Sequence, residues 1–267
     1  MPIREIISSS NRYIKEYRRL AGNRKYRRAA GKLAVEGPNA VKEALSAGLA
    51  PEVVFFTRNF IDDGGTAILS CLPGGSRQYL VNSSLFARLA DTETPQEIAA
   101  ITPFGAPELS SVMARPLSLV LILDSLRDPG NMGTIVRTAA AAGVDALFFG
   151  PGTVDPYSPK ALRASAGAIF HLPPVAVEEP LRLLKLLQSG GMLVLAAQPQ
   201  GGRLYWEMDL RGKTAFLIGG ESGGLSPELA AAADLDVTIP QLAPLDSLNA
   251  AVAAAVLVYE VLRQRSG

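Results

Sequence analysis

Six apolar runs alternate with helix-forming stretches in the second half of the chain, and this pattern constrains the fold more than any other feature. The runs cover residues 117–124, 146–150, 174–177, 192–198, 214–220 and 236–240. Strands that are buried on both faces need continuous apolar residues, and intervening helices are typical of parallel connections. The pattern therefore predicts an α/β domain over residues 117–267 with a parallel sheet covered on both faces.

A smaller α/β domain is predicted to precede it, over residues 1–105. Its expected helices cover residues 11–33 with a break near Gly22–Asn23, a segment starting at Pro38, about 61–72, and 83–90. Its expected strands cover residues 52–56, 77–81 and 97–102. Residues 103–116 are rich in turn formers, so we interpret 106–116 as the linker between the domains.

Positive charge is concentrated at the start of the chain. Residues 1–32 contain ten Lys and Arg side chains against Glu5 and Glu16, which gives this segment a net charge of +8, although the whole chain carries only +1. Clustered cations release counterions from a polyanion, so the segment indicates RNA or DNA binding, with Tyr13, Tyr17 and Tyr26 as candidate stacking groups. The RNA-contact candidates are Lys15, Arg24, Arg27 and Arg28. A solvated helix face remains the alternative.

Other features limit the class of protein. The chain has one cysteine, Cys71, and one histidine, His171, so no internal disulfide and no Cys/His metal cluster is expected. Neither residue is expected to be catalytic. The low cysteine content fits a reducing cytoplasm. The sequence shows no uncharged signal segment and no apolar run of about 18 residues, so we expect neither export nor a membrane span. G-x-x-x-x-G-K-[ST] and G-x-G-x-x-G signatures are missing, which disfavours a nucleotide-dependent metabolic enzyme.

Polar and glycine residues gather where three of the predicted strands end. Asn131 and Arg137 follow the first run, "GGESGG" follows the fifth, and "PQLAPLDSLN" follows the sixth. Ligands of parallel sheets bind outside the carboxyl ends of the strands. We therefore expect one pocket, surrounded by Asn131, Arg137, Gly219, Gly220, Glu221, Gly223, Gly224, Ser247 and Asn249.

Each of these residues also has an ordinary structural interpretation. Asn131, Ser226 and Ser247 could be N-caps of the helices that follow them. Asn249 could cap or face solvent in the first turn of the last helix, and Arg137 could pair with Glu221.

The three segments carry a resemblance. "LDSLRDPGNMGTIVRTAAAAG", "LIGGESGGLSPEL" and "VTIPQLAPLDSLNAAVAAAVLVYE" resemble, in order and spacing, the three motifs of the SpoU (TrmH-type) RNA ribose 2′-O-methyltransferases. The N-terminal "IKEYRRLAGNRKYRRAAGKLAVEGPNAVKEAL" is similar to the small RNA-binding α/β domain of many members, which is itself similar to ribosomal proteins.

The resemblance implies a fold, a cofactor and an assembly. It implies a deep C-terminal trefoil knot in the second domain and a homodimer formed through that domain. It also implies S-adenosylmethionine bound in a bent form by Ala196, Ala197, Gly219, Gly220, Ile239 and Leu248, with no metal.

The implied activity is methyl transfer to a ribose 2′-hydroxyl of structured RNA, with ribosomal RNA expected because a recognition domain precedes the catalytic one. Asn131, Arg137, Glu221, Ser247 and Asn249 would form the catalytic set. A guanidinium is a poor base, so we expect Arg137 to stabilise the developing alkoxide while Asn131 and Asn249 orient it or the ribose. Glu221 would anchor Arg137 or the knot loop, and Ser247 would bind substrate or organise the loop. The alternatives are a tRNA 2′-O-methyltransferase and a non-catalytic RNA-binding or assembly factor of the same fold.

Overall fold

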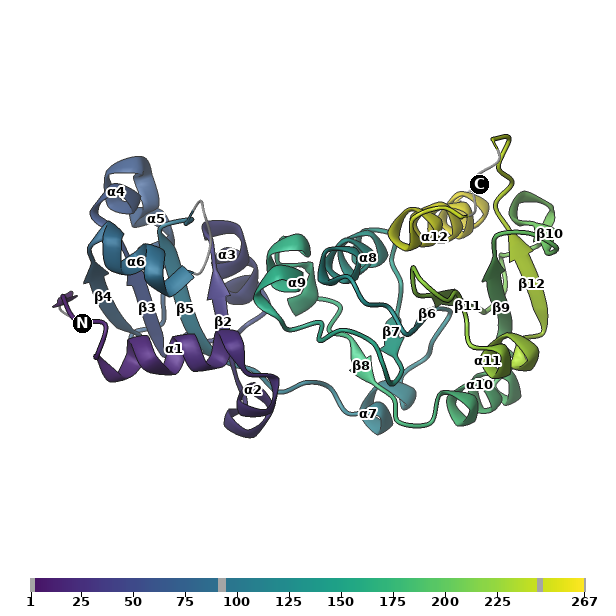
Figure 1. Cartoon of the computed structure of the whole chain (residues 1–267), viewed down its shortest axis with the longest axis horizontal. Helices are drawn as coiled ribbons and strands as arrows, with labels where there is room; N and C mark the ends of the chain where they lie inside the picture. The colour runs from purple at the N-terminus through teal and green to yellow at the C-terminus, as the bar shows by residue number, and fades with distance from the viewer. Residues whose placement is uncertain (1–2, 91–94, 244–246, 267) are drawn as a thin grey trace. The chain divides into compact units, whose positions relative to one another are not determined.

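The structure, a computed structural model, describes residues 3–90, 95–243 and 247–266 (Figure 1). The chain forms two compact units, each with its own sheet. Unit 1 contains Met1–Gly105 and Tyr157–Phe170, and unit 2 contains Ala106–Pro156 and His171–Gly267. Unit 1 therefore includes a segment that lies, in the sequence, between two strands of unit 2.

Unit 1 is built on a five-stranded mixed sheet with the order β1-β4-β3-β5-β2. The strands are β1 (Arg4–Ile6), β2 (Lys32–Glu36), β3 (Val53–Phe56), β4 (Arg77–Val81) and β5 (Ile98–Pro103). The helices are α1 (Arg12–Gly22), α2 (Arg24–Ala30), α3 (Pro38–Ser46), α4 (Arg58–Phe60), η1 (Ile61–Gly65), α5 (Thr66–Ser70), α6 (Ser83–Ala90), α9 (Pro159–Ala164) and η2 (Ala168–Phe170). The apolar faces of α1 and α6 share one core with the sheet.

The end of α2 explains why the first predicted helix is too long. Gly31 adopts the left-handed conformation at φ 61°, which glycine favours and which ends a helix. Residues 32–36 then form β2, paired antiparallel with β5. The predicted break at Gly22–Asn23 is confirmed, because the Asn23 side chain caps α2 by accepting the Tyr26 N–H.

The segment from α9 is anchored to unit 1 by a buried carboxylate. Glu36 ends β2 with only 4% of its side chain exposed, and its Oε2 lies 3.1 Å from Nη1 of Arg163 on α9. Gly167, at φ 91°, packs so closely against Glu43 that an added Cβ would lie 2.4 Å from the glutamate Cβ.

Unit 2 is built on a seven-stranded sheet with the order β10-β12-β9-β11-β6-β7-β8, in which the described neighbours are all parallel. Its strands are β6 (Leu119–Asp124), β7 (Ala146–Phe149), β8 (Val175–Ala176), β9 (Leu193–Gln198), β10 (Arg203–Leu204), β11 (Thr214–Gly219) and β12 (Leu235–Thr238). Its helices are α7 (Leu109–Met113), α8 (Pro129–Ala141), α10 (Pro180–Ser189), η3 (Tyr205–Glu207), α11 (Pro227–Ala232) and α12 (Ala250–Ser266).

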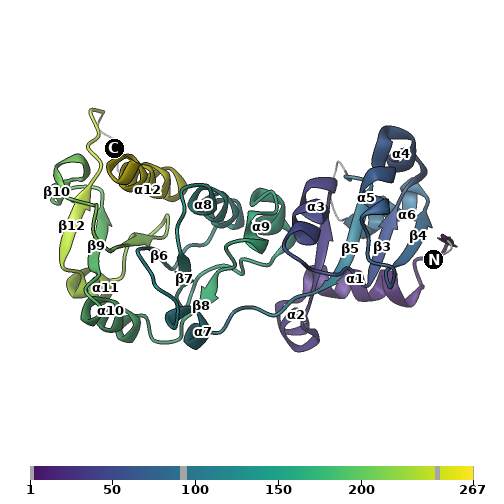
Figure 2. The same cartoon turned by 180° about the vertical axis from the view of Figure 1, so that it is seen from behind.

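Helices cover both faces of this sheet, as predicted. Figures 1 and 2 show α8 and α12 side by side on one face, and α7, α10 and α11 on the other. The six predicted apolar runs are β6, β7, β8, β9, β11 and β12. The short elements β1, β10 and α7 were not predicted. α7 lies inside the expected linker, and its few apolar residues pack on the unit 2 core.

Candidate functional site

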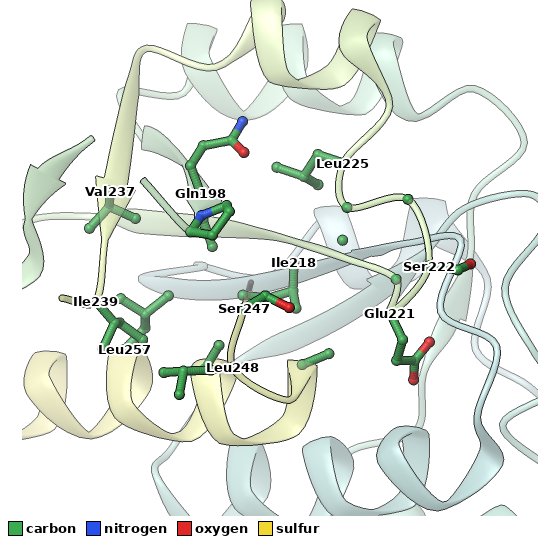
Figure 3. Close-up of a pocket in the computed structure, with 18 of the residues that line it drawn as sticks. Gln198, Ile218, Glu221, Ser222, Leu225, Val237, Ile239, Ser247, Leu248 and Leu257 are labelled. Atoms are coloured by element: carbon green, nitrogen blue, oxygen red, sulfur yellow. The ribbon is translucent and has the colours of Figure 1, made fainter. Parts of the chain in front are cut away.

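A cavity of about 400 Å³ opens at the carboxyl ends of three neighbouring strands, β9, β11 and β12 (Figure 3). Its walls come from residues 197–199 and 218–225, and from Val237, Ile239, Gln241, Ser247, Leu248, Ala250, Ala253 and Leu257. Of the six expected cofactor contacts, five line it: Ala197, Gly219, Gly220, Ile239 and Leu248. Ala196 is the exception, because it is fully buried in the core beneath the sheet. Glu221 and Ser247 also line the cavity, whereas Asn131, Arg137 and Asn249, which were expected around the same pocket, are not among its lining residues.

Two glycines allow the backbone after β11 to fold tightly. A Cβ on Gly219 would lie 2.2 Å from the Gly224 carbonyl carbon, and one on Gly220 would lie 2.2 Å from the Ser125 oxygen. The Gly224 N–H donates to the Gly220 oxygen at 3.0 Å and closes the loop on itself. Gly223, in the same loop, has open space where a Cβ would be. The first two glycines are therefore required by contact, and Gly223 is not.

The loop after β6 is fixed against the glycine loop, which is residues 219–224. Asp124 Oδ2 accepts the Ser226 N–H at 2.7 Å, which joins the ends of β6 and of the glycine loop. Ser125 adopts φ 55°, uncommon for a residue other than glycine. Asp128 is the N-cap of α8 and its Oδ1 accepts the Asn131 N–H at 2.8 Å, so the expectation that Asn131 caps this helix is wrong.

The Asn131 side chain instead belongs to a chain of hydrogen bonds that joins all three motif segments. Asn131 Nδ2 donates to Glu221 Oε1 at 2.5 Å, and Asn249 Nδ2 donates to Asn131 Oδ1 at 3.0 Å. Asn249 Oδ1 accepts the Ala251 and Val252 N–H groups, so Asn249 caps α12 and the expected cap by Ser247 is wrong. A carboxylate only accepts, so Glu221 fixes the orientation of the Asn131 amide and, through it, that of Asn249.

The Glu221 carboxylate is held in its charged form. Desolvation by burial alone would raise its pKa, but the hydrogen bonds from the Asn131 side chain and from backbone N–H groups, including that of Arg127, hold the pKa of Glu221 below its ordinary value. The Glu221 carboxylate, which accepts from the Asn131 amide, therefore stays ionised at neutral pH.

Arg137 lies on α8, less than two turns after Asn131, and its side chain is exposed. It forms no hydrogen bond or ion pair with another described residue, so the alternative in which it pairs with Glu221 is wrong. The fork of Arg137 is thus available to a ligand.

Ser226 holds the predicted N-cap position of α11, followed by Pro227, although its side chain accepts no capping hydrogen bond.

The basic residues of unit 1 divide into two groups. Lys15, Arg24 and Arg28 are exposed on α1 and α2. Arg27 is 7% exposed, and its guanidinium donates to the backbone oxygens of Leu20 and Ala21 at the end of α1. Arg27 is therefore a structural residue and does not belong with the exposed cations that could contact RNA.

The tyrosines expected to stack on bases are also largely internal. Tyr13 and Tyr17 belong to the core, with the Tyr17 hydroxyl donating to the Val35 oxygen at 3.4 Å. Tyr26 is half-buried, and Arg19 lies 4.0 Å from the centre of its ring.

Gln198 and Gln241 also line the cavity and were not among the residues predicted from the sequence. Their position directly at or after predicted strand ends was the signal that could have found them. Across residues 3–90, 95–243 and 247–266, no group of three or more His, Cys, Asp or Glu side chains could hold a metal ion. No helix in that part of the chain is long and apolar enough to cross a membrane.

Comparison with known proteins assigns both parts of the chain. The model of the SpoU rRNA Methylase family matches residues 118–259. The model of the MRM3-like substrate binding domain matches residues 11–100.

Full-length relatives agree with these matches. One relative is the 23S rRNA (guanosine(2553)-2'-O)-methyltransferase RlmP of Bacillus subtilis, to which the chain is 35% identical over 260 residues. The match covers 97% of this chain and 99% of RlmP. The chain is 30% identical, over 99% of this chain and 94% of the relative, to the 23S rRNA (uridine(2479)-2'-O)-methyltransferase of Streptomyces viridochromogenes. A crystal structure of the SpoU methyltransferase AviRb from S. viridochromogenes in complex with AdoMet superposes with a TM-score of 0.86 at 28% identity, covering 96% of this chain and 99% of AviRb. The chain belongs to the SpoU rRNA methylase family.

Proposed function

We propose that this protein transfers a methyl group from S-adenosylmethionine to the 2′-hydroxyl of a ribose in ribosomal RNA. The observation that carries the proposal is the hydrogen-bonded chain Glu221–Asn131–Asn249, which joins the three motif segments beside a cavity at the carboxyl edge of the sheet. The fold around this cavity is that of a SpoU methyltransferase crystallised with AdoMet.

The cavity fits a cofactor of this kind. Its volume of about 400 Å³ lies within the range of small-molecule sites, roughly 300–1,000 Å³. Gly219 and Gly220 expose backbone at its wall, and Ile239, Leu248 and Leu257 give it an apolar surface. These residues would hold S-adenosylmethionine, which when bound supplies an activated methyl group on a sulfonium.

The side chains of the three motif segments would then have different roles. Arg137 is exposed and would offer its planar fork to the oxygen that gains charge during transfer, or to the neighbouring phosphate. Glu221, Asn131 and Asn249 would be positioning residues, because their hydrogen bonds are used to hold α8, the glycine loop and α12 together. Ser247 lines the cavity with its side chain exposed and would contact the ribose or phosphate.

RNA recognition would fall to unit 1, through Lys15, Arg24 and Arg28. The two full-length relatives are named for different nucleosides, a guanosine and a uridine. A catalytic site that acts on ribose does not need to read the base, so we assign the choice of nucleotide to unit 1. With ribosomal RNA as its substrate, the protein would act in the cytoplasm, the compartment expected from the sequence.

We further propose that the last segments of unit 2 form a knot and that the protein is a homodimer joined through this unit. The support is an exposed apolar stripe on α12, formed by Val252, Tyr259 and Leu262, which are 49%, 47% and 37% exposed. Burial of such a stripe is a typical reason for association. Replacement of Tyr259 and Leu262 by Lys should convert a dimer into a monomer in analytical ultracentrifugation; a monomeric wild-type protein would contradict the proposal.

Label transfer tests the activity and separates its alternatives. The purified protein is incubated with methyl-labelled S-adenosylmethionine and either unmodified 23S rRNA transcript or tRNA. We expect label in the rRNA, recovered in an alkali-resistant dinucleotide, which marks a methylated 2′-oxygen. Label in tRNA alone would identify the tRNA alternative, and rRNA binding without label would identify the non-catalytic factor.

A further inference from the structure

Three exposed arginines of unit 1 converge on a pair of buried tyrosines. Arg12, the first residue of α1, donates from Nη2 to the Tyr13 hydroxyl, and its Cζ lies 4.5 Å from the centre of the Tyr13 ring. Cζ of Arg77, the first residue of β4, lies 5.7 Å from the same ring centre. Figures 1 and 2 show the start of α1 beside β4. These two cations therefore share one patch of surface.

Arg4 reaches the same patch from the neighbouring strand. Its register partner in the parallel pair of β1 and β4 is Tyr79, so the two side chains project from the same face of the sheet. The centre of the Tyr79 ring lies 5.5 Å from that of Tyr13. Burial raises the pKa of Tyr79 and Tyr13 adds to this, whereas the charges of Arg4 and Arg77 oppose it because both lie near its hydroxyl. We call Arg4, Arg12 and Arg77 the arginine cluster.

The arginine cluster has no counter-charge among the residues that the structure describes. None of its three members forms an ion pair there. Glu16, one turn after Arg12 on α1, is bound to Lys32. Glu52, whose backbone oxygen accepts an N–H of β4, is bound to the same lysine. Glu5 projects from the opposite face of β1, and the first turn of α1 contains no acidic residue.

The arrangement is one that an anion would stabilise. Three guanidiniums held together without a carboxylate repel one another, and the N-terminus of α1 adds partial positive charge at the same place. A planar guanidinium binds phosphate oxygens by two parallel N–H bonds. We infer that the arginine cluster holds one phosphodiester of the RNA substrate. The inference rests on the proposed function, since it names a contact between unit 1 and the RNA that the protein methylates.

The exposed cations of α1 favour an RNA chain over a free phosphate ion as the occupant. Arg12, Lys15 and Arg19 follow one another at intervals of three and four residues, so they share one face of the helix, and all three are exposed. This row is about 10 Å long at 1.5 Å per residue, and the arginine cluster lies at its start. A row of this kind suits an extended polyanion, whereas a single phosphate ion would occupy only one end of it.

Phosphate ethylation interference tests the site directly, because an ethylated phosphodiester has lost its negative charge. A sparsely ethylated 23S rRNA transcript is bound to the protein, and the phosphates whose ethylation prevents binding are mapped. The wild-type protein is compared with the triple variant Arg4→Gln, Arg12→Gln and Arg77→Gln. We expect the interference at one phosphate to disappear in the triple variant while the rest of the pattern persists. Arg58→Gln, an exposed arginine at the start of α4, is the control and should give the wild-type pattern.

The salt dependence of binding separates one shared phosphate from three separate contacts. In filter binding the triple variant should bind about tenfold more weakly at low salt, the loss of one charge-assisted contact. The slope of log K against log salt should become shallower by about 0.7, the value for one phosphate of a single strand. The melting temperature should stay close to that of the wild type, because the substitutions remove mutual repulsion together with the exposed contact to Tyr13. Label transfer at saturating rRNA should be retained.

An ethylation pattern of the triple variant identical to that of the wild type would overturn the inference. A slope shallower by about 2 would also overturn it, since it would indicate three separate contacts. Calorimetry with inorganic phosphate tests the other source of the anion. Binding of that ion to the wild type, lost in the triple variant without any change in RNA binding, would assign the cluster to a free anion and overturn the inference.

Two further provisions keep the result decisive. If the triple variant does not fold or binds too weakly to map, Arg77→Gln alone is mapped, and an unchanged pattern there overturns the inference. Absence of label transfer by the wild-type protein would refute the proposed function. The ethylation pattern does not depend on label transfer, so the two failures are distinguishable.

Discussion

The two functional regions hold their polar residues in opposite ways. At the carboxyl edge of the sheet in unit 2, the side chains of Glu221, Asn131 and Asn249 bond to one another and to backbone groups, so their orientations are fixed. On α1 and α2 of unit 1, Lys15, Arg24 and Arg28 extend into solvent.

The difference matches what each region has to do. Catalysis gains from groups that are oriented before the reaction, whereas attraction of RNA phosphates depends on charge density and little on exact orientation. Substitutions in unit 2 should therefore change the chemical step or cofactor binding, and substitutions of exposed cations in unit 1 should change RNA affinity and its salt dependence.

The largest expected effect is that of Arg137→Lys. Lysine keeps the charge but loses the planar fork, so we expect kcat to fall by about 10²–10³-fold, as for removal of one transition-state donor. Single-turnover methyl transfer measures this, with calorimetry to show unchanged cofactor affinity. Arg182→Lys, an exposed arginine on α10, is the control. Near-normal turnover by Arg137→Lys would remove Arg137 from the catalytic set.

The next effect compares two glycines of one loop. Gly219→Ala places a Cβ 2.2 Å from backbone, whereas Gly223→Ala places one in open space. Overpacking of this kind costs about 1–3 kcal/mol, so Gly219→Ala should lower the free energy of unfolding by that amount and weaken cofactor binding. Urea denaturation and calorimetry should find Gly223→Ala close to the wild type. Similar behaviour of the two variants would show that the loop is less tightly fixed than its contacts indicate.

Arg27→Met should separate structure from RNA binding within unit 1. Its removal leaves the Leu20 and Ala21 oxygens without their buried donor, which should cost about 1–3 kcal/mol in the free energy of unfolding. The salt dependence of RNA binding should stay unchanged. The exposed neighbour Arg28→Met should show the reverse pattern, and a salt effect of Arg27→Met would return Arg27 to the RNA surface.

Replacing Lys15, Arg24 and Arg28 together by Gln should weaken RNA binding at low salt. If each contacts a phosphate, the slope of log K against log salt should become shallower by about 2, at roughly 0.7 per contact for single strands. Filter binding at several salt concentrations measures the slope, and kcat at saturating RNA should be retained. An unaltered slope would place the RNA elsewhere on the protein.

The smallest expected effect is the pH dependence of Glu221→Gln. Because the pKa of Glu221 is lowered in the folded protein, its charged form stabilises the fold above its ordinary value of 4.5, and this contribution disappears as the pH falls through the lowered folded value. The wild type should therefore exceed Glu221→Gln in stability at pH 7, and the difference should shrink as the pH falls below 4.5 and through the lowered folded pKa. A difference that stays constant between pH 7 and pH 3 would show that the Glu221 charge is not the cause.

The edge of the sheet that carries the site could be predicted from the sequence, because parallel strands all end at one edge and residues after β6, β11 and β12 therefore lie there. Their proximity depends on the strand order β12-β9-β11-β6, which the apolar runs did not predict. The environment of single side chains could not be predicted in this way. Arg137 falls in an Ala-rich apolar helix and yet is exposed, and Arg27 falls in a basic segment and yet is buried.

Local capping was predicted less well, because several residues of similar chemistry stand next to one another. Asp128 and Asn131 are both suitable caps for α8, and Ser247 and Asn249 are both suitable for α12. At α8 the Asn131 amide is engaged by Glu221, and Asp128 is the cap. At α12 Asn249 does both, because its Nδ2 donates to Asn131 while its Oδ1 accepts from the first turn of the helix.

The most direct test of the central claim is a crystal structure with bound S-adenosylhomocysteine. We predict that the ligand lies in the cavity at the carboxyl edge, in contact with Gly219, Ile239 and Leu248. Binding of the ligand at any other place on the protein, with this cavity left empty, would contradict the account.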